Sequence, residues 1–123
     1  MPRVLVIDDD EVFVKLMMLA LKQRGYEVEY ALDGEAGYRA FKASDFDAVI
    51  CDIVMPEKEG IETIRDIRDA APDAKIIAIS GGGRIGNTDF LKIARQLGAS
   101  EVVAKPLDPD HFLEIVRSCL AAA

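Results

Sequence analysis

The chain has 123 residues, and 22 Asp and Glu against 15 Lys and Arg give it a net charge of −7. Half of the residues are hydrophobic, as in a soluble globular domain, and the length fits one domain, which we expect to span residues 1–123. The acidic excess argues against binding to nucleic acid or to a membrane surface, because both need clustered basic residues. No apolar run approaches the ~20 residues of a membrane span, and the run Val4–Ile7 is too short for an export signal, so we expect a cytoplasmic protein.

Five short runs rich in β-branched residues predict β-strands. Three of them, Val4–Ile7, Ala48–Cys51 and Ile76–Ile79, are continuously apolar, which is typical of strands covered on both faces. The other two are Glu27–Tyr30 and Val102–Ala104.

Segments with helical periodicity follow each strand. The apolar positions that we expect to face the core are Phe13, Leu16, Met17, Ala20 and Leu21; Ala36, Ala40 and Phe41; Ile61, Ile64, Ile67 and Ala71; Phe90, Ile93, Ala94 and Leu97; and Phe112, Ile115, Val116 and Cys119. Asp10, Asp33 and Asp108 are the expected N-caps, while Gly25 and Gly98 follow helix ends. Together the pattern predicts five helices.

Strict alternation of five strands and five helices predicts a three-layer α/β/α sandwich around a parallel sheet. The flavodoxin-like strand order 2-1-3-4-5 suits this count, and its ligand site lies beyond the carboxyl ends of strands 1 and 3. Both cysteines, Cys51 and Cys119, fall inside apolar patterns without metal-ligand spacing, so we expect them to be reduced core residues.

Polar residues stand at the predicted carboxyl ends of the strands: Asp8 and Asp9 after the first, Asp52 after the third, Ser80 after the fourth and Lys105 after the fifth. Three converging carboxylates repel one another unless a cation offsets them, and oxygen-only ligands favour Mg²⁺ or Mn²⁺ over zinc. Each residue alone has an ordinary reading as a cap, a turn residue or a solvated charge. Their joint occurrence, each at the end of the expected strand, indicates a functional site.

In these positions the chain resembles a response-regulator receiver domain of two-component signalling, similar to the chemotaxis regulators. The matching residues are Asp8-Asp9, Asp52-Ile53-Val54-Met55-Pro56 with Gly60, Ser80, and Lys105-Pro106. The resemblance covers Val4 to Leu120, with no output domain in these residues.

The resemblance implies that Asp52 accepts a phosphoryl group from a phosphohistidine of a sensor histidine kinase or a histidine phosphotransfer protein. It also implies that Asp8, Asp9, Asp52 and the backbone carbonyl of Val54 bind Mg²⁺ or Mn²⁺. Lys105 and Ser80 would then contact the phosphoryl oxygens. The expected product is a changed conformation that passes a signal, rather than a released chemical product.

In relatives, the signalling face combines the fourth helix, the fifth strand and the fifth helix, and here its downstream target is unknown. One departure is Val102, which stands where relatives have an aromatic switch residue. Another is the glycine-rich segment Gly81–Gly86, for which a surface loop and a moving element both stay open. Homodimer formation through the same face also stays open, and His111 is read as a surface residue.

Other classes of protein fit less well. A flavin binder would place a phosphate against Asp8-Asp9-Asp10, which would repel it. A Mg²⁺-dependent aspartyl-phosphate phosphatase would carry its nucleophile after the first strand and would need a cap domain. A receiver-like interaction module that is never phosphorylated remains the third alternative.

Overall fold

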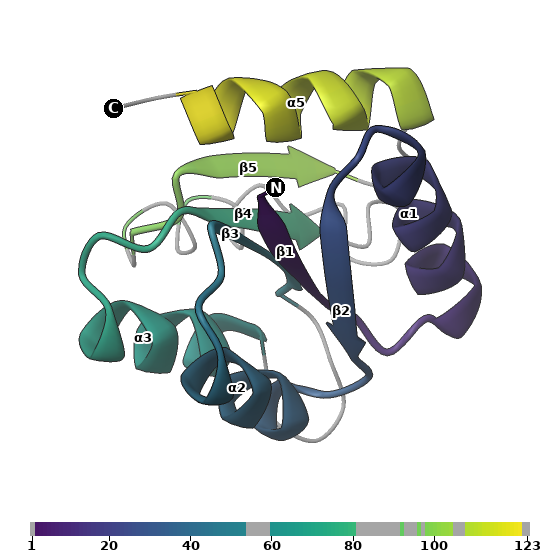
Figure 1. Ribbon diagram of the computed structural model, residues 1–123. Coiled ribbons are helices and arrows are strands. Elements are labelled where there is room, and N and C mark those ends of the chain that lie inside the picture. The colour runs from purple at the N-terminus through teal and green to yellow at the C-terminus, as the bar shows by residue number, and fades with distance from the viewer. Residues whose placement is uncertain are drawn as a thin grey trace.

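The computed structural model describes residues 2–53, 60–80, 92, 96, 98–104 and 108–121. Among the described elements, strands and helices alternate up to the fourth strand, and a helix follows the fifth strand (Figure 1). Their bounds are β1 (Arg3–Ile7), α1 (Glu11–Gln23), β2 (Glu27–Ala31), α2 (Gly34–Ala43), β3 (Ala48–Asp52), α3 (Gly60–Ala70), β4 (Ile76–Ser80), β5 (Glu101–Ala104) and α5 (Pro109–Ala121). All five predicted strands are confirmed, and each is one residue longer than the run of residues that predicted it.

The five strands form one parallel sheet in the order β2-β1-β3-β4-β5, which confirms the predicted topology. In this register Ile7 lies opposite Cys51, and Asp52 lies opposite Ile79. Because neighbouring parallel strands end together, the residues that follow β1 and β3 meet at one edge of the sheet.

Helices cover both faces of the sheet, as Figure 1 shows: α1 and α5 lie on one face, and α2 and α3 lie on the other. Alternate strand residues feed the two resulting cores. Val4, Val6 and Ile50 point to the α1 and α5 side, whereas Leu5, Ile7 and Val49 point to the α2 and α3 side. β1 and β3 are therefore buried on both faces, as their continuous apolar runs predict.

The prediction for α1 was wrong in one part, because Leu16 is 56% exposed and does not face the core. The buried side of α1 consists of Val14, Met17 and Leu21. Apolar residues occur almost all around this helix, so the periodicity alone does not identify which side faces the sheet.

The predicted caps of α1 and α2 are confirmed. Asp10 Oδ1 accepts a hydrogen bond from the Phe13 N–H at 3.1 Å, and Asp33 Oδ1 accepts one from the Ala36 N–H at 2.7 Å. Each aspartate thus satisfies a backbone N–H that has no partner within its helix. At the other end of α1, Gly25 has φ +89°, a conformation that favours glycine after a helix.

The helix α2 buries glycines more fully than it buries the expected residues. Gly34 and Gly37 are buried, whereas Ala36, Ala40 and Phe41 are half-buried. A Cβ at Gly37 would lie 2.5 Å from Ile7 Cδ1, so glycine lets α2 approach β1 closely.

The expected faces of α3 and α5 agree better with the structure. Ile64 and Ile67 are buried while Ile61 and Ala71 are half-buried, and Ile115 is half-buried while Phe112, Val116 and Cys119 are buried. Of the expected fourth helix, Lys92 and Gln96 are described and are helical, but Phe90, Ile93, Ala94 and Leu97 lie outside the described residues. Gly98 has φ +104°, in keeping with the predicted helix end.

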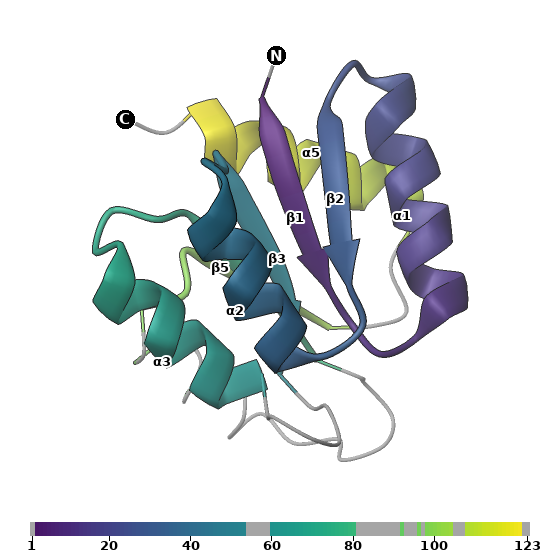
Figure 2. The ribbon, with the colours of Figure 1, turned by 60° about the horizontal axis from the view of Figure 1, so that its bottom comes forward.

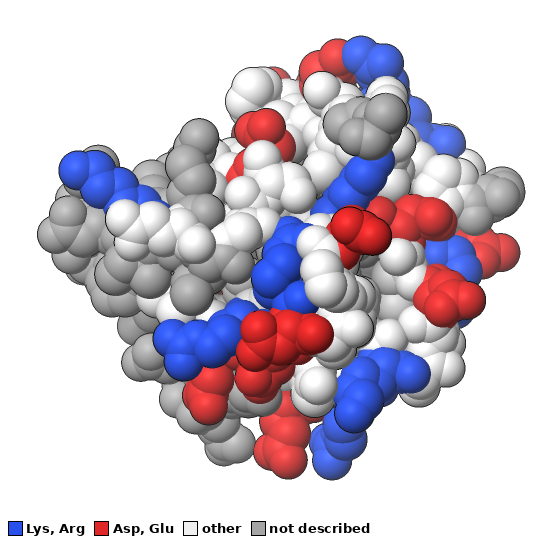
Figure 3. Space-filling model, turned by 90° about the vertical axis from the view of Figure 1, so that its left-hand side faces the viewer, with Lys and Arg blue, Asp and Glu red and all other residues white. Residues whose placement is uncertain are grey.

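The amino end of the sheet lies opposite the arrowheads of the strands, and the last turn of α5 comes close to the start of β1 there (Figure 2). Seen from this side, basic and acidic side chains are interspersed (Figure 3). Arg3 pairs with Glu27 and Glu29 on β2, and its backbone N–H donates to Asp47 Oδ2 at 2.7 Å. Lys75 Nζ donates to the Leu120 carbonyl at 3.2 Å and so ties the end of α5 to the loop before β4.

Candidate functional site

The site begins where β1 ends. Asp8 directly follows Ile7 and is only 1% exposed, and its backbone N–H donates to the Ala31 carbonyl of β2 at 3.1 Å. Its Oδ1 accepts a hydrogen bond from the Asp10 N–H at 3.0 Å. The strand pairing and this turn fix the Asp8 carboxylate, while Asp9 is exposed beside it.

The third aspartate is the last residue of β3. Asp52 is 4% exposed, and the N–H of the next residue, Ile53, donates to the Ile79 carbonyl of β4 at 2.9 Å. Asp52 is therefore held between β1 and β4, at the centre of the sheet's carboxyl end.

The carboxylates of Asp8, Asp9 and Asp52 come together as the sequence predicts. One oxygen from each lies within 4.8 Å of the others. Burying two of these carboxylates beside a third is unfavourable unless positive charge offsets them. An all-oxygen set of this size, open to water on the Asp9 side, fits a magnesium-type cation better than zinc.

The residue next to Asp52 has a thiol, and the site makes this thiol inert. Cys51 is fully buried, and burial first, then the charges of Asp52 and Asp8, raise the pKa of its thiol far above the ordinary value. A protonated thiol is a poor metal ligand and a poor nucleophile. Cys51 and Cys119 are both free and buried, which confirms their predicted position in the core.

Other predicted site residues lie outside what the structure describes. Val54 and Lys105 are not among the described residues, nor is the glycine-rich segment Gly81–Gly86. The backbone of Ser80 ends β4, opposite Ala104 of β5, but its side chain is not described. The sheet order does bring the ends of β3, β4 and β5 side by side.

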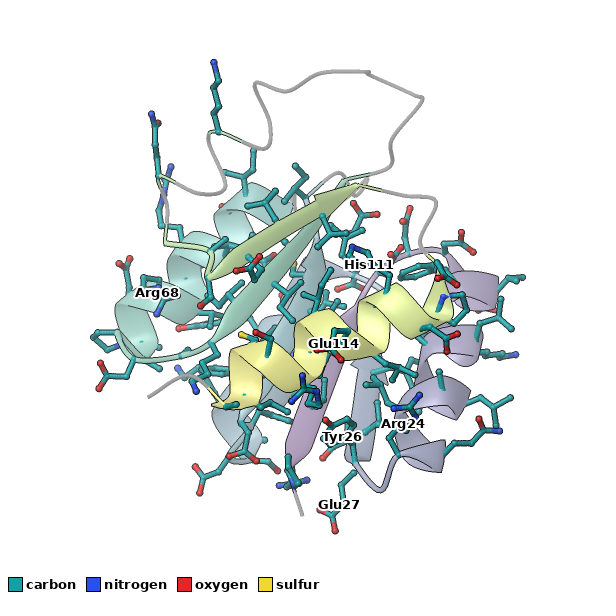
Figure 4. The ribbon with its side chains drawn as sticks, turned by 90° about the horizontal axis from the view of Figure 1, so that it is seen from above. Arg24, Tyr26, Glu27, Arg68, His111 and Glu114 are labelled. Atoms are coloured by element: carbon teal, nitrogen blue, oxygen red, sulfur yellow. The ribbon has the colours of Figure 1, made fainter. Side chains whose placement is uncertain are left out.

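The face that the family resemblance associates with signalling can be described in part. Val102 on β5 is half-buried and packs against the core on the α2 and α3 side. His111 is exposed in the first turn of α5, which agrees with its reading as a surface residue (Figure 4). Further along α5, Glu114 pairs with Arg117, and this contact lowers the pKa of the Glu114 carboxyl.

In the sequence, Gly60 is only one member of a motif, yet in the structure Gly60 lies against the site itself. A Cβ at this position would lie 1.7 Å from the Asp52 carbonyl oxygen. The fixed spacing from Asp52 to Gly60 was the available signal, but only the structure shows which atoms meet.

In the described part of the chain, no helix has both the length and the apolar character needed to cross a membrane.

Comparison with known proteins identifies the class that this fold and site define. The response regulator receiver domain family matches residues 4–117, and the chain belongs to this family. It is 37% identical over 121 residues to the chemotaxis protein CheY of Treponema pallidum, covering 96% of this chain and 82% of that protein. It is 29% identical over 123 residues to the response regulator receiver protein CpdR of Brucella abortus, covering all of both chains.

Solved structures agree with this assignment. A CheY-like receiver domain from Methanospirillum hungatei superposes with a TM-score of 0.91 at 27% identity, over 98% of this chain and 94% of that one. Several relatives are much longer: the chain spans 17% of the sensor kinase/phosphatase CqsS of Vibrio cholerae and 50% of the regulatory protein DltR of Streptococcus agalactiae. What these whole proteins do therefore does not transfer directly to this chain.

Proposed function

We propose that this chain is a phospho-accepting receiver domain in which Asp52 takes a phosphoryl group from a phosphohistidine. The donor would be a sensor histidine kinase or a histidine phosphotransfer protein. The observation that carries the proposal is the meeting of three carboxylates, from Asp8, Asp9 and Asp52, at the carboxyl end of the sheet in a chain of the receiver family.

In the proposed step, an oxygen of the Asp52 carboxylate attacks the phosphorus atom. The new P–O bond forms as the P–N bond to the donor imidazole breaks, and the electron pair of that bond returns to the imidazole nitrogen. The product is an acyl phosphate on Asp52. Because a carboxylate is already ionised at neutral pH, this nucleophile needs no general base, and the protein contributes alignment and charge compensation.

Asp8, Asp9, Asp52 and the backbone carbonyl of Val54 would hold Mg²⁺ or Mn²⁺. When bound, such a cation neutralises the negative charge that accumulates between the carboxylates and the phosphoryl oxygens. The described carboxylates support this ligand set by their oxygen donors and their spacing, while Val54 enters from the family resemblance.

Lys105 and Ser80 would contact the phosphoryl oxygens once they are on Asp52. These roles rest on the family motif and on the strand order, which puts the ends of β4 and β5 next to the end of β3. Contacts that exist only in the phosphorylated form favour one arrangement of the loops, and this bias is the signal.

The output would be read by an unidentified downstream protein on the face that includes β5 and α5. With Val102 in place of an aromatic residue, any repacking at this position involves a smaller side chain than in relatives. We further propose that residues 1–123 form one receiver domain that works in the cytoplasm as a signalling switch, catalysing only its own phosphorylation and dephosphorylation.

The test is incubation of the chain with acetyl phosphate and Mg²⁺ followed by intact mass measurement. We expect one added phosphoryl group, which chelation of Mg²⁺ prevents and which is absent in Asp52→Ala. Asp47→Ala is the matched control, because Asp47 precedes the same strand at its opposite end. A wild-type chain that stays unlabelled while a known receiver is labelled would refute the proposal and favour an unphosphorylated interaction module.

A further inference from the structure

The first residue of α3 packs directly on the peptide that carries the proposed phospho-acceptor. Gly60 is buried, and a Cβ built on it would lie 1.7 Å from the Asp52 carbonyl oxygen and 2.4 Å from Ile53 Cα. These are backbone atoms of the sheet, so they cannot rotate away as a side chain could. The end of β3 and the start of α3 are thus in a contact that only glycine permits.

A side chain from the strand bridges the same contact. The Cys51 Sγ lies 3.4 Å from the Asp52 carbonyl oxygen and 3.9 Å from the Gly60 carbonyl oxygen. As a weak donor, a thiol can share its proton between these two acceptors. Cys51 therefore links the end of β3 to the first residue of α3, with almost no space left between them.

This contact acts on the backbone next to the Asp52 carboxylate. An alanine at position 60 would need the two backbones to separate by roughly 1 Å or more, since packed interiors contain few voids that could absorb it. The movement would fall on the Asp52–Ile53 peptide, whereas Asp8 is held by separate hydrogen bonds to Ala31 and Asp10. Asp52 would shift relative to Asp8 and Asp9.

We propose that Gly60 is a positioning residue for the phospho-acceptor, and that the Cys51 thiol holds Gly60 in place. Together they fix the distance between the Asp52 carboxylate and the carboxylates of Asp8 and Asp9. The inference rests on the proposed function of Asp52, but its metal-binding part is testable without phosphoryl transfer.

The chain provides a matched control for Gly60. Gly37 also lies in a helix packed on the sheet, but the three atoms nearest to a Cβ there are side-chain atoms of Ile7, at 2.5 to 2.9 Å. The contact at Gly37 involves a side chain of β1, so its strain falls on Ile7 and α2 and does not act on the Asp52–Ile53 peptide. Gly37→Ala therefore tests helix–sheet crowding alone, and Cys119→Ala likewise controls for Cys51→Ala, because Cys119 is a buried free cysteine on α5.

The experiment measures the Kd of Mg²⁺ by titration calorimetry and the rate of phosphorylation by acetyl phosphate at saturating Mg²⁺. Both are measured at a temperature where circular dichroism shows each variant folded. For Gly60→Ala we expect a Kd at least about tenfold higher and a rate about 10- to 100-fold lower, the size that a shift near 1 Å produces. Gly37→Ala should change neither quantity more than about twofold, even if its Tm falls.

A folded Gly60→Ala variant with the wild-type Kd and rate overturns the proposal, as does a Gly37→Ala variant with the same losses as Gly60→Ala. If Gly60→Ala does not fold, the comparison of Cys51→Ala with Cys119→Ala tests the proposal. We then expect Cys51→Ala to raise the Kd about three- to fivefold while Cys119→Ala leaves it unchanged, and equal values in the two variants overturn the proposal. A wild-type chain that binds Mg²⁺ but takes no phosphoryl group would refute the proposed function while the Kd values still test positioning.

Discussion

The two ends of the sheet differ in how their charged side chains are arranged. At the amino end, Arg3 pairs with carboxylates of β2, Arg68 donates to the carbonyls of Pro72 and Gly98, and Lys75 donates to a carbonyl at the end of α5. At the carboxyl end, three carboxylates lie within 4.8 Å of one another. The contacts at the amino end therefore add stability without any ligand, whereas we expect the carboxyl end to gain stability when a cation binds.

The largest expected effect of this difference is the response to Mg²⁺. At about 100 times its Kd, Mg²⁺ should stabilise the wild-type chain by about 2.7 kcal/mol, because the folded state alone assembles the three carboxylates. Asp9→Asn should reduce this gain below about 1 kcal/mol and raise the metal-free stability, since it removes one of the repelling charges. Urea unfolding with Mg²⁺ and with chelator measures both.

Asp47→Asn is the control for this prediction, because it removes a carboxylate at the amino end. Its Mg²⁺ gain should equal that of the wild type. An equal loss of the gain in Asp9→Asn and Asp47→Asn would mean that the cation acts on the overall negative charge and not on the carboxyl end.

The second prediction concerns Arg68, which joins the end of α3 to the segment before β5 (Figure 4). Its Nη1 donates to the Pro72 carbonyl at 2.6 Å, and its Nη2 donates to the Gly98 carbonyl. Arg68→Met should lower the free energy of unfolding by about 2 kcal/mol, because two carbonyls lose a charged donor. The Kd of Mg²⁺ should stay unchanged.

Arg65→Met controls for the same substitution on the exposed side of α3, where we expect a change within about 0.5 kcal/mol. If Arg68→Met also weakened Mg²⁺ binding, the two ends of the sheet would be coupled. This result would contradict the view that contacts at the amino end affect stability alone.

These ends were not equally predictable from the sequence. The carboxyl end follows from strand order, because parallel strands that are neighbours end together, so Asp8, Asp9 and Asp52 had to meet once the topology was known. The amino-end contacts of Arg68 depend on how the loop at Pro72 and the backbone at Gly98 come together. No periodicity encodes such contacts between loops.

The close contacts between helices and the sheet could not be predicted from the sequence either. An apolar pattern predicts that a helix covers the sheet, but it does not show that Gly60 touches the Asp52 peptide or that Gly37 touches Ile7. Likewise, the apolar pattern of α1 predicts that Leu16 faces the core, because this helix has apolar residues on nearly every side. The way α1 packs on the sheet determines which side of the helix is buried, and that side contains Val14 and Met17 instead of Leu16.

The third prediction compares two N-caps, one beside the carboxylate cluster and one away from it. Asp10 caps α1 and Asp33 caps α2, each by one side-chain hydrogen bond. Asp33→Ala should cost about 1 kcal/mol, and Asp10→Ala should cost about half as much without metal, because it also removes a charge next to Asp8 and Asp9. In saturating Mg²⁺ the two losses should become equal, as thermal unfolding can show, and a difference that persists in Mg²⁺ would contradict this explanation.

The smallest expected effect is an alkaline loss of stability at the amino end. Burial, with Glu101 adding to it and Lys75 opposing it, raises the pKa of the Cys119 thiol in the folded state. A raised pKa means that the folded chain holds this proton more tightly than the unfolded chain does. The contribution is then fully present below the unfolded pKa of about 8.5 and is lost as the pH rises through the folded pKa.

We expect this loss to be small, because Lys75 stabilises the thiolate and so limits how far burial raises the pKa of Cys119. Cys119→Ala removes the titrating group, so its stability should fall less steeply than that of the wild type between pH 8.5 and 10. Urea unfolding over this range, with chelator present so that the carboxylates contribute equally to both chains, measures the two slopes. Equal slopes would show that the thiol ionises as easily in the folded chain as in the unfolded one, and that the amino end is open to water beside Cys119.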